Sequence, residues 1–289
     1  MRSSSKMRVV LSLLAVAPLS VVAVAQQPGA AKPPLYNTAK QKLLDHKQIF
    51  SFTVFKLDVA DYCEKAKHYD YTWFDMQHST LEFKDIETMI AACPKAPAIP
   101  MIRVPDAHEW MIQHATDIGA LGIIVPTVDD GNKAREAAKW IRYPPIARRS
   151  SGQGLGATIW GNGDYRHTID DNMLLIVMIE TPTGVSNADE IASTPGVDVV
   201  IIGNNDLTQF SGYPATDPHY QEMITKVHDA AIKAGKISGE ANWNFAKGNP
   251  LSSTSYFFQN GPSNDGWTPP PAAGRGGAGR GGAAPAPGR

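Results

Sequence analysis

Short runs of β-branched and other apolar residues alternate with longer amphipathic segments along most of the chain. The short runs are typical of strands buried on both faces, and the longer segments have the spacing of helices. We predict strands at residues 49–55, 71–76, 98–104, 122–128, 174–179, 197–203, 236–241 and 254–259. We predict helices at residues 58–68, 81–93, 107–118, 130–140, 184–193 and 217–234. This order favours an α/β fold, a (β/α)8 TIM-type barrel with a truncated C-terminal end, over an open doubly wound sheet.

Two stretches depart from a regular barrel. Residues 142–172 form a Gly-rich, polar insertion before the fifth predicted strand, and we expect it to be a mobile loop near the site. Only residues 242–253 remain for a helix after the seventh strand, and no helix is legible after the eighth.

The two ends of the chain are expected to lie outside the barrel. A basic start, an apolar run over residues 9–24 and small residues before Gln26 predict a signal peptide at residues 1–25, cleaved after Ala25. An uncleaved membrane anchor is the alternative. Residues 26–39 are predicted to be a linker, 40–268 the barrel domain and 269–289 a disordered Gly/Pro/Ala/Arg tail. We therefore expect a periplasmic or secreted protein with no membrane contact after cleavage.

Composition narrows the range of partners. The 289 residues carry a formal net charge of −1, which gives no reason to expect binding to nucleic acid. The cysteines, Cys63 and Cys93, fall on the first two predicted helices. In an exported protein a disulfide between them would persist, and two buried free thiols are an equal alternative.

Two carboxylates follow consecutive predicted strands. Glu180 directly follows the strand 174–179, and Asp206 follows the strand 197–203. Strands joined by a helix run parallel, about 4.8 Å apart, so both side chains emerge at the same edge of the sheet and can converge on one cation. The alternative is that Glu180 caps the next helix and Asp206 lies in a turn.

Two more strand ends carry polar groups at that edge. Asp75 and His78 follow the second predicted strand, and their spacing lets the carboxylate hold the imidazole in one tautomer, as for a general base. Arg103 ends the third strand in an otherwise apolar run, and a buried guanidinium needs an anionic partner. The alternatives are a histidine that merely lies near a helix start, and a structural salt bridge from Arg103 to Asp75 or Glu180.

Five segments together resemble one known family. They are FDMQHS (74–79), PMIRVP (100–105), DIGALGIIVPTVDDGNKAREAAKWIRYPP (117–145), IETPTGVSN (179–187) and GVDVVIIGNNDLTQFSGYP (196–214). In this order and spacing they are similar to the HpcH/HpaI aldolases, metal-dependent 2-keto-acid aldolases related to citrate lyase β subunits. The resemblance runs from about Lys40 to Gly239.

The resemblance implies a (β/α)8 barrel and a divalent cation (Mg, Mn or Co) held by Glu180 and Asp206, with no organic cofactor. It implies that Arg103 binds the carboxylate of pyruvate and that Asp75 and His78 form an acid/base pair. The other residues implied beside the substrate are Met178, Gly203, Asn204 and Asn205.

The implied reaction is carbon–carbon lysis. A 4-hydroxy-2-keto acid would be cleaved, through a metal-stabilised enolate, to pyruvate or a related 2-keto acid and an aldehyde, or formed in reverse. The alternatives are an exported, non-catalytic relative that binds metal and keto acid, and an oxaloacetate-type decarboxylase. Gln77, Met178 and Asn204-Asn205 stand where the family usually has Glu, Gln and Pro-Ala. Family hexamers exchange a C-terminal helix between subunits, and this sequence shows no pattern of such a helix. A homo-oligomer is compatible with the sequence, but a hexamer is not assumed.

Overall fold

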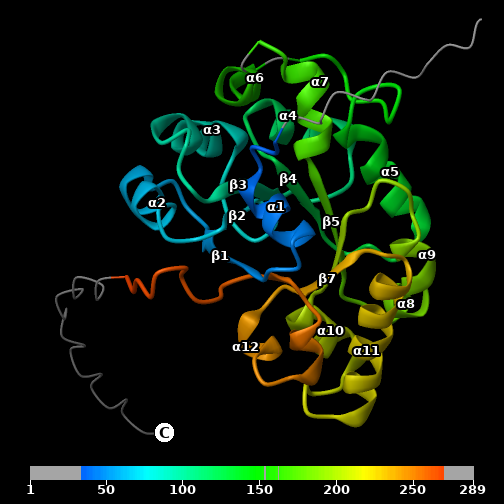
Figure 1. The fold of residues 1–289 in the computed structure, drawn as a ribbon. Coiled ribbons are helices and arrows are strands. Elements are labelled where there is room, and N and C mark those ends of the chain that lie inside the picture. Colours follow the sequence, from blue (N-terminus) through cyan, green and yellow to red (C-terminus); the bar gives the residue numbers. More distant parts are fainter. Residues whose placement is uncertain (1–33, 153, 162, 270–289) are drawn as a thin grey trace, which may run out of the picture. The chain divides into compact units, whose positions relative to one another are not determined.

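The computed structural model describes residues 34–152, 154–161 and 163–269, and its core is a closed barrel of parallel strands (Figure 1). Each strand pairs with the next, and the last pairs with the first. The strands are β1 (Ile49–Val54), β2 (Tyr71–Asp75), β3 (Ile99–Arg103), β4 (Gly122–Val125), β5 (Leu174–Ile179), β6 (Val199–Ile202), β7 (Ile237–Glu240) and β8 (Phe257–Phe258). The predicted TIM-type fold is confirmed.

Helices follow most strands and cover the outside of the barrel (Figure 1). They are α1 (Thr38–Leu44), α2 (Val59–Lys65), α3 (Phe83–Ala92), α4 (Glu109–Asp117), α5 (Gly131–Ile141), α6 (Gly154–Trp160), α7 (Tyr165–Asn172), α8 (Pro182–Ser186), α9 (Ala188–Ala192), α10 (Asn204–Ser211), α11 (Pro218–Lys233) and α12 (Trp243–Ala246), with a 3-10 turn at Pro250–Ser253. No helix of the described residues has the length and apolar character needed to cross a membrane.

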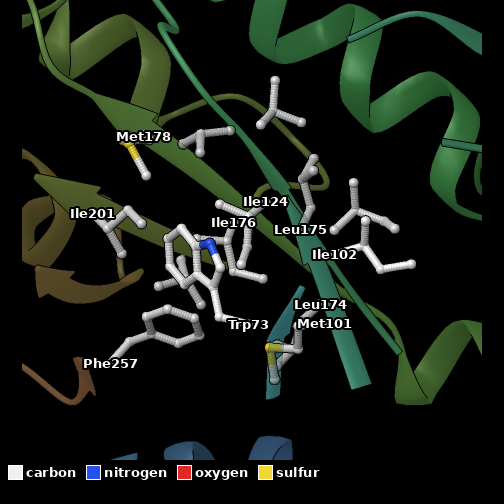
Figure 2. Close-up of a cluster of buried hydrophobic side chains, with 14 of the residues drawn as sticks. Trp73, Met101, Ile102, Ile124, Leu174, Leu175, Ile176, Met178, Ile201 and Phe257 are labelled. Carbon is white, nitrogen blue, oxygen red and sulfur yellow. The ribbon is translucent and has the colours of Figure 1, made fainter. Parts of the chain in front are cut away.

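Most strand residues are apolar and buried because both faces of the strands are covered. Along β2, Tyr71, Trp73 and Asp75 alternate with Phe74, whose ring packs 5.2 Å from that of Tyr62 in α2. Figure 2 shows part of the buried cluster that fills the core, including Trp73 and Met178. The last residue of β2, Asp75, is therefore a buried carboxylate.

The insertion between β4 and β5 differs from the prediction. The expected loop at residues 142–172 contains helices α6 and α7. The buried side chain of Arg149 joins α7 to α4. Its Nη2 donates to Asp117 at 2.8 Å and to the Tyr165 hydroxyl at 3.1 Å, and its guanidinium lies 4.7 Å from the centre of the Tyr143 ring. The Gly-rich composition suggested a loop and gave no sign of this buried arginine.

The predicted helix at residues 184–193 is two short helices. Thr181 caps α8 by accepting a hydrogen bond from Gly184 N–H at 3.0 Å, and Pro182 occupies the first helical turn. Asn187 separates α8 from α9, and its side chain donates to the carbonyl of Asp129 at 2.8 Å. The alternative in which Glu180 caps this helix is therefore wrong.

The chain end replaces a final helix with an extended strap, residues 260–267, that returns along β1. Asn260 N–H donates to the Ser51 hydroxyl at 3.3 Å, and Asn264 N–H donates to the carbonyl of His68 at 2.8 Å. The truncated end is as expected, and no helix follows β8 among the described residues up to 269. The predicted signal peptide and the disordered tail beyond residue 269 lie outside the described residues.

The two cysteines are bonded. Cys63 in α2 and Cys93 at the end of α3 form a disulfide with a Cα–Cα distance of 5.9 Å. The structure therefore has the disulfide and not the two free thiols.

Candidate active site

A cavity of about 290 Å³ opens at the carboxyl ends of the strands. Its lining includes every residue proposed for the site from the sequence, namely Asp75, His78, Arg103, Met178, Glu180, Gly203, Asn204, Asn205 and Asp206. The sequence did not point to Phe55, Ala241, Asn242, Gln259 and Asn260, which follow β1, β7 and β8 and complete the wall. A barrel places ligands at this edge, so the position of the cavity agrees with the chemistry of its lining.

A larger cavity, of about 510 Å³, lies near the start of β2 and β3. Its buried carboxylate, Asp70, is already bonded to Lys42, to Phe50 N–H at 2.9 Å and to the Asn264 amide at 3.1 Å. Since this carboxylate is fully engaged, we place the chemistry in the smaller cavity.

Arg103 and Asp75 form a buried two-bond ion pair. The two residues are directly opposite in the β2–β3 register. Arg103 Nε donates to Asp75 Oδ1 at 3.1 Å, and Nη2 donates to Oδ2. The arginine is 8% exposed, and its Nη1 has no hydrogen-bond partner among the described residues. The pair thus fixes the guanidinium while leaving one edge available to an anion in the cavity.

His78 meets Asp75 through its backbone. The N–H groups of Gln77 and His78 each donate to Asp75 Oδ1 at 3.1 Å, in a tight turn after β2. The His78 imidazole is exposed on the cavity wall, and no hydrogen bond joins it to Asp75 in the described part of the chain. The expected carboxylate–imidazole contact is absent because the in-register guanidinium occupies the carboxylate, as in the salt-bridge alternative.

Glu180 is a buried carboxylate, 1% exposed. Its Oε1 accepts hydrogen bonds from the N–H of Thr127 at 2.7 Å and from the Thr127 hydroxyl at 3.0 Å. Thr127 has φ +50°, a conformation that β-branched residues rarely adopt, and it aims both donors at one oxygen. Burial, followed by the adjacent Asp206, raises the pKa of Glu180 to about 7. The two carboxylates therefore repel each other when both are ionised.

Asp206 lies in the first turn of α10, which begins directly after β6. The helix follows Gly203, and a Cβ placed there would lie 2.4 Å from Glu180 Oε2 and 3.0 Å from the Met178 sulfur. Only glycine leaves Glu180 its place beside the helix. The alternative in which Asp206 lies in a turn is wrong, since it belongs to a helix.

The carboxylate pair has the character of a hard-cation site. Two adjacent carboxylates, one buried and one half-buried, border an open cavity. A divalent cation there would offset both the burial of Glu180 and the repulsion from Asp206, which together raise the pKa of Glu180. No cluster of three or more His, Cys, Asp or Glu side chains suited to a metal occurs among the described residues, so water or substrate oxygens would complete the coordination.

A second buried acid near the cavity was missed. Glu240 ends β7 and is 1% exposed, and its Oε2 accepts a hydrogen bond from Asn204 Nδ2 at 2.9 Å. Its position at the carboxyl end of a strand is the signal that identified Glu180, and the same reasoning would have found it.

The chain is similar in sequence to known aldolases. A hydroxypyruvate/pyruvate aldolase of Roseobacter denitrificans is 32% identical over 213 residues, covering 72% of this chain and 83% of that protein. A 2-keto-3-deoxy-L-rhamnonate aldolase of Shigella sonnei is 33% identical over 175 residues, or 59% of this chain and 66% of that protein.

The fold and the sequence profile agree as well. A solved HpcH/HpaI aldolase/citrate lyase family protein from Burkholderia cenocepacia has the same fold, with a TM-score of 0.70 at 24% identity, over 77% of this chain and 91% of that one. The family model for HpcH/HpaI aldolase/citrate lyase matches residues 55–244, which hold the predicted site. The resemblance is thereby confirmed, and the chain belongs to the HpcH/HpaI aldolase/citrate lyase family.

Proposed function

We propose that this protein is a divalent-metal-dependent aldolase that cleaves a 4-hydroxy-2-keto acid to pyruvate, or a related 2-keto acid, and an aldehyde. The observation that carries the proposal is the single cavity lined by a carboxylate pair, the buried Glu180 and the half-buried Asp206, and by the buried arginine Arg103. The aldolase names of the relatives support the reaction class.

The residues divide the work as follows. Glu180 and Asp206 would hold the cation (Mg, Mn or Co), which supplies Lewis-acid polarisation of the keto group. Arg103, held in place by Asp75, would bind the substrate carboxylate through Nη1. His78, exposed on the cavity wall, would accept the proton of the C4 hydroxyl as the C3–C4 bond breaks. The bond electrons pass to C3, which is then protonated to give the methyl group of pyruvate.

Export is part of the proposal. The predicted signal peptide motivates it, and the Cys63–Cys93 disulfide supports it because disulfides persist in oxidising compartments.

Hydrogen–deuterium exchange at the pyruvate methyl group tests the enolate step without knowledge of the aldehyde. We expect exchange, followed by proton NMR, only with Mg²⁺, Mn²⁺ or Co²⁺ present. It should disappear in Arg103→Ala and persist in Arg148→Ala, a matched change at an exposed arginine. Exchange that persists in Arg103→Ala would refute the assignment of Arg103 as the residue that binds the substrate carboxylate.

His78 distinguishes the enzyme from a non-catalytic relative and from a decarboxylase. His78→Ala should retain metal and pyruvate affinity but lose aldol cleavage by about 10²-fold or more, since it removes the general base. His219→Ala, at an exposed histidine of α11, is the control.

If pyruvate binds and no exchange occurs with any metal, the protein is a binding relative. Release of carbon dioxide from oxaloacetate without aldol turnover would identify the decarboxylase.

A further inference from the structure

The buried polar group at the end of β7 consists of Asn204, Glu240 and Tyr220. Asn204 is the first residue of α10 and is 1% exposed, as is Glu240. Asn204 Nδ2 donates to Glu240 Oε2 at 2.9 Å and to the Tyr220 hydroxyl at 3.1 Å. Both amide hydrogens are thus committed away from the substrate, although Asn204 lies in the cavity wall.

Two oxygens of this group are left over. Asn204 Oδ1 and Glu240 Oε1 are buried and have no hydrogen-bond partner among the described residues. Leaving a buried acceptor unpaired costs about 1–3 kcal/mol. Two unpaired acceptors within one pair of bonded side chains therefore need an explanation. Both are acceptors and both belong to the same side-chain pair. One added proton between them would satisfy both.

A carboxylic acid and a primary amide can form two hydrogen bonds in a ring. The amide N–H donates to one carboxyl oxygen, and the carboxyl O–H donates to the amide oxygen. The first of these bonds is present between Asn204 and Glu240. The second would use the two oxygens without a partner, and it requires that Glu240 carry a proton on Oε1.

The surroundings of Glu240 favour the neutral acid. Its neighbours in the sheet register are the apolar residues Ile202 and Phe258, Asn204 faces it from α10, and Tyr220 faces it from α11. No salt bridge joins Glu240 to a cation in the described part of the chain. Burial raises the pKa of Glu240 to about 7, although the Asn204 hydrogen bond opposes the shift, and burial raises the pKa of Tyr220 to about 12.

We propose that Glu240 is held as a neutral acid in a two-bond ring with Asn204, and that this ring positions the first turn of α10, which carries Asp206. Glu240 is thus a positioning residue that acts on the cation site through Asn204. The inference extends the proposed function, and it rests on it only in assigning Asp206 as a metal ligand. Loss of the proton sets two oxygens against each other, opens the ring and weakens metal binding.

Infrared difference spectra test the proton directly. Metal-free wild type minus Glu240→Gln in D2O at mildly acidic pH should show the carbonyl stretch of a protonated carboxylic acid, which fades as pH rises through about 7. The experiment needs neither metal nor turnover, so its failure is distinct from a failure of the proposed aldolase activity. Absence of the band would overturn the inference.

Mn²⁺ affinity against pH tests the positioning role. Deprotonation of Glu180 itself raises Mn²⁺ affinity over the same pH range, so wild type is compared with Glu240→Gln, which keeps Glu180 and has a two-bond amide–amide ring that does not titrate. The ratio of wild-type to Glu240→Gln affinity should fall about tenfold as pH rises through 7, the scale of losing a group that supports a metal ligand. Glu240→Ala should bind weakly at every pH, and Glu222→Gln, at an exposed site on α11, should match wild type. A folded Glu240→Gln that fails to bind Mn²⁺, or a ratio that does not change with pH, would overturn the inference.

Discussion

Glu180 follows β5 and Glu240 ends β7 of the same barrel, and the two are equally buried. Their neighbours nevertheless favour different binding partners. Each is 1% exposed, and burial raises the pKa of each to about 7. Beside Glu180 lies a second carboxylate, Asp206, whereas beside Glu240 lies a neutral amide, Asn204. A shared pKa value therefore conceals two different kinds of site.

The neighbours of each acid decide whether a cation or a proton suits it. Glu180 stands at an open cavity next to like charge, and its Oε1 already has two donors, so a divalent cation can neutralise both carboxylates where one proton neutralises only one. Glu240 has no ion pair among the described residues, and one of its oxygens has no donor, so a proton suffices. Four experiments test this contrast.

Removing the carboxylate of Glu180 should have the largest effect. Glu180→Ala leaves Asp206 as a lone acidic ligand, and Mn²⁺ affinity should fall by more than about 100-fold, beyond the usual cost of losing a supporting group. Isothermal titration and the metal content of the purified protein measure it. Glu222→Ala is the matched control, and an unchanged metal content in Glu180→Ala would refute the site.

Stability against pH should reveal both raised pKa values. The folded pKa of Glu180 exceeds its unfolded value, so its contribution is fully present below about 4.5 and is lost as pH rises through about 7. The free energy of unfolding of metal-free protein should thus fall on the order of 3 kcal/mol more than that of Glu180→Gln over this window. Denaturant titrations at both ends give the difference. Saturating Mn²⁺ should abolish the decline in unfolding free energy that Glu180 causes, but not the decline that Glu240 causes. Identical responses of the two acids to Mn²⁺ would contradict the contrast.

Filling the space at Gly203 should displace Glu180 without touching Glu240. The Cβ of Gly203→Ala would lie 2.4 Å from Glu180 Oε2, so we expect Mn²⁺ affinity to fall about 10- to 100-fold while the fold is kept. Titration calorimetry measures the affinity, and circular dichroism checks the fold. Gln209→Ala, at an exposed position of the same helix, is the control. Equal affinity in wild type and Gly203→Ala would show that Glu180 can move without loss.

Removing one hydrogen bond to Glu180 should have the smallest effect. Thr127→Val deletes the hydroxyl donor and keeps the backbone donor and the branched shape, at a cost of about 1 kcal/mol in carboxylate stabilisation. The pKa of Glu180 should rise further, and metal affinity at pH 6 should fall more than at pH 8. Parallel loss at both pH values would mean that the hydroxyl has another role.

The barrel and most of the cavity could be predicted because they depend on local patterns. Continuous apolar runs ending in Glu180, Asp206 or Arg103 place these groups at one edge, whatever the side-chain details. The Asp75 partner was misjudged because register, not sequence spacing, set Arg103 opposite it. Thr127 and the burial of Arg149 could not be foreseen, since each depends on contacts between distant segments. The two helices of the insertion were missed for the same reason.

The strap at residues 260–267 leads away from the mouth of the cavity. It runs from the rim of the cavity at Asn260 to the carbonyl of His68, ahead of β2, and the indole of Trp267 stacks on the His68 ring at 4.6 Å. The cavity opens at the far end of the same strand. Attachment to a solid support at the exposed residues 265–266 of the strap should therefore leave the mouth of the cavity facing the solution, which suits the protein to use as an immobilised catalyst.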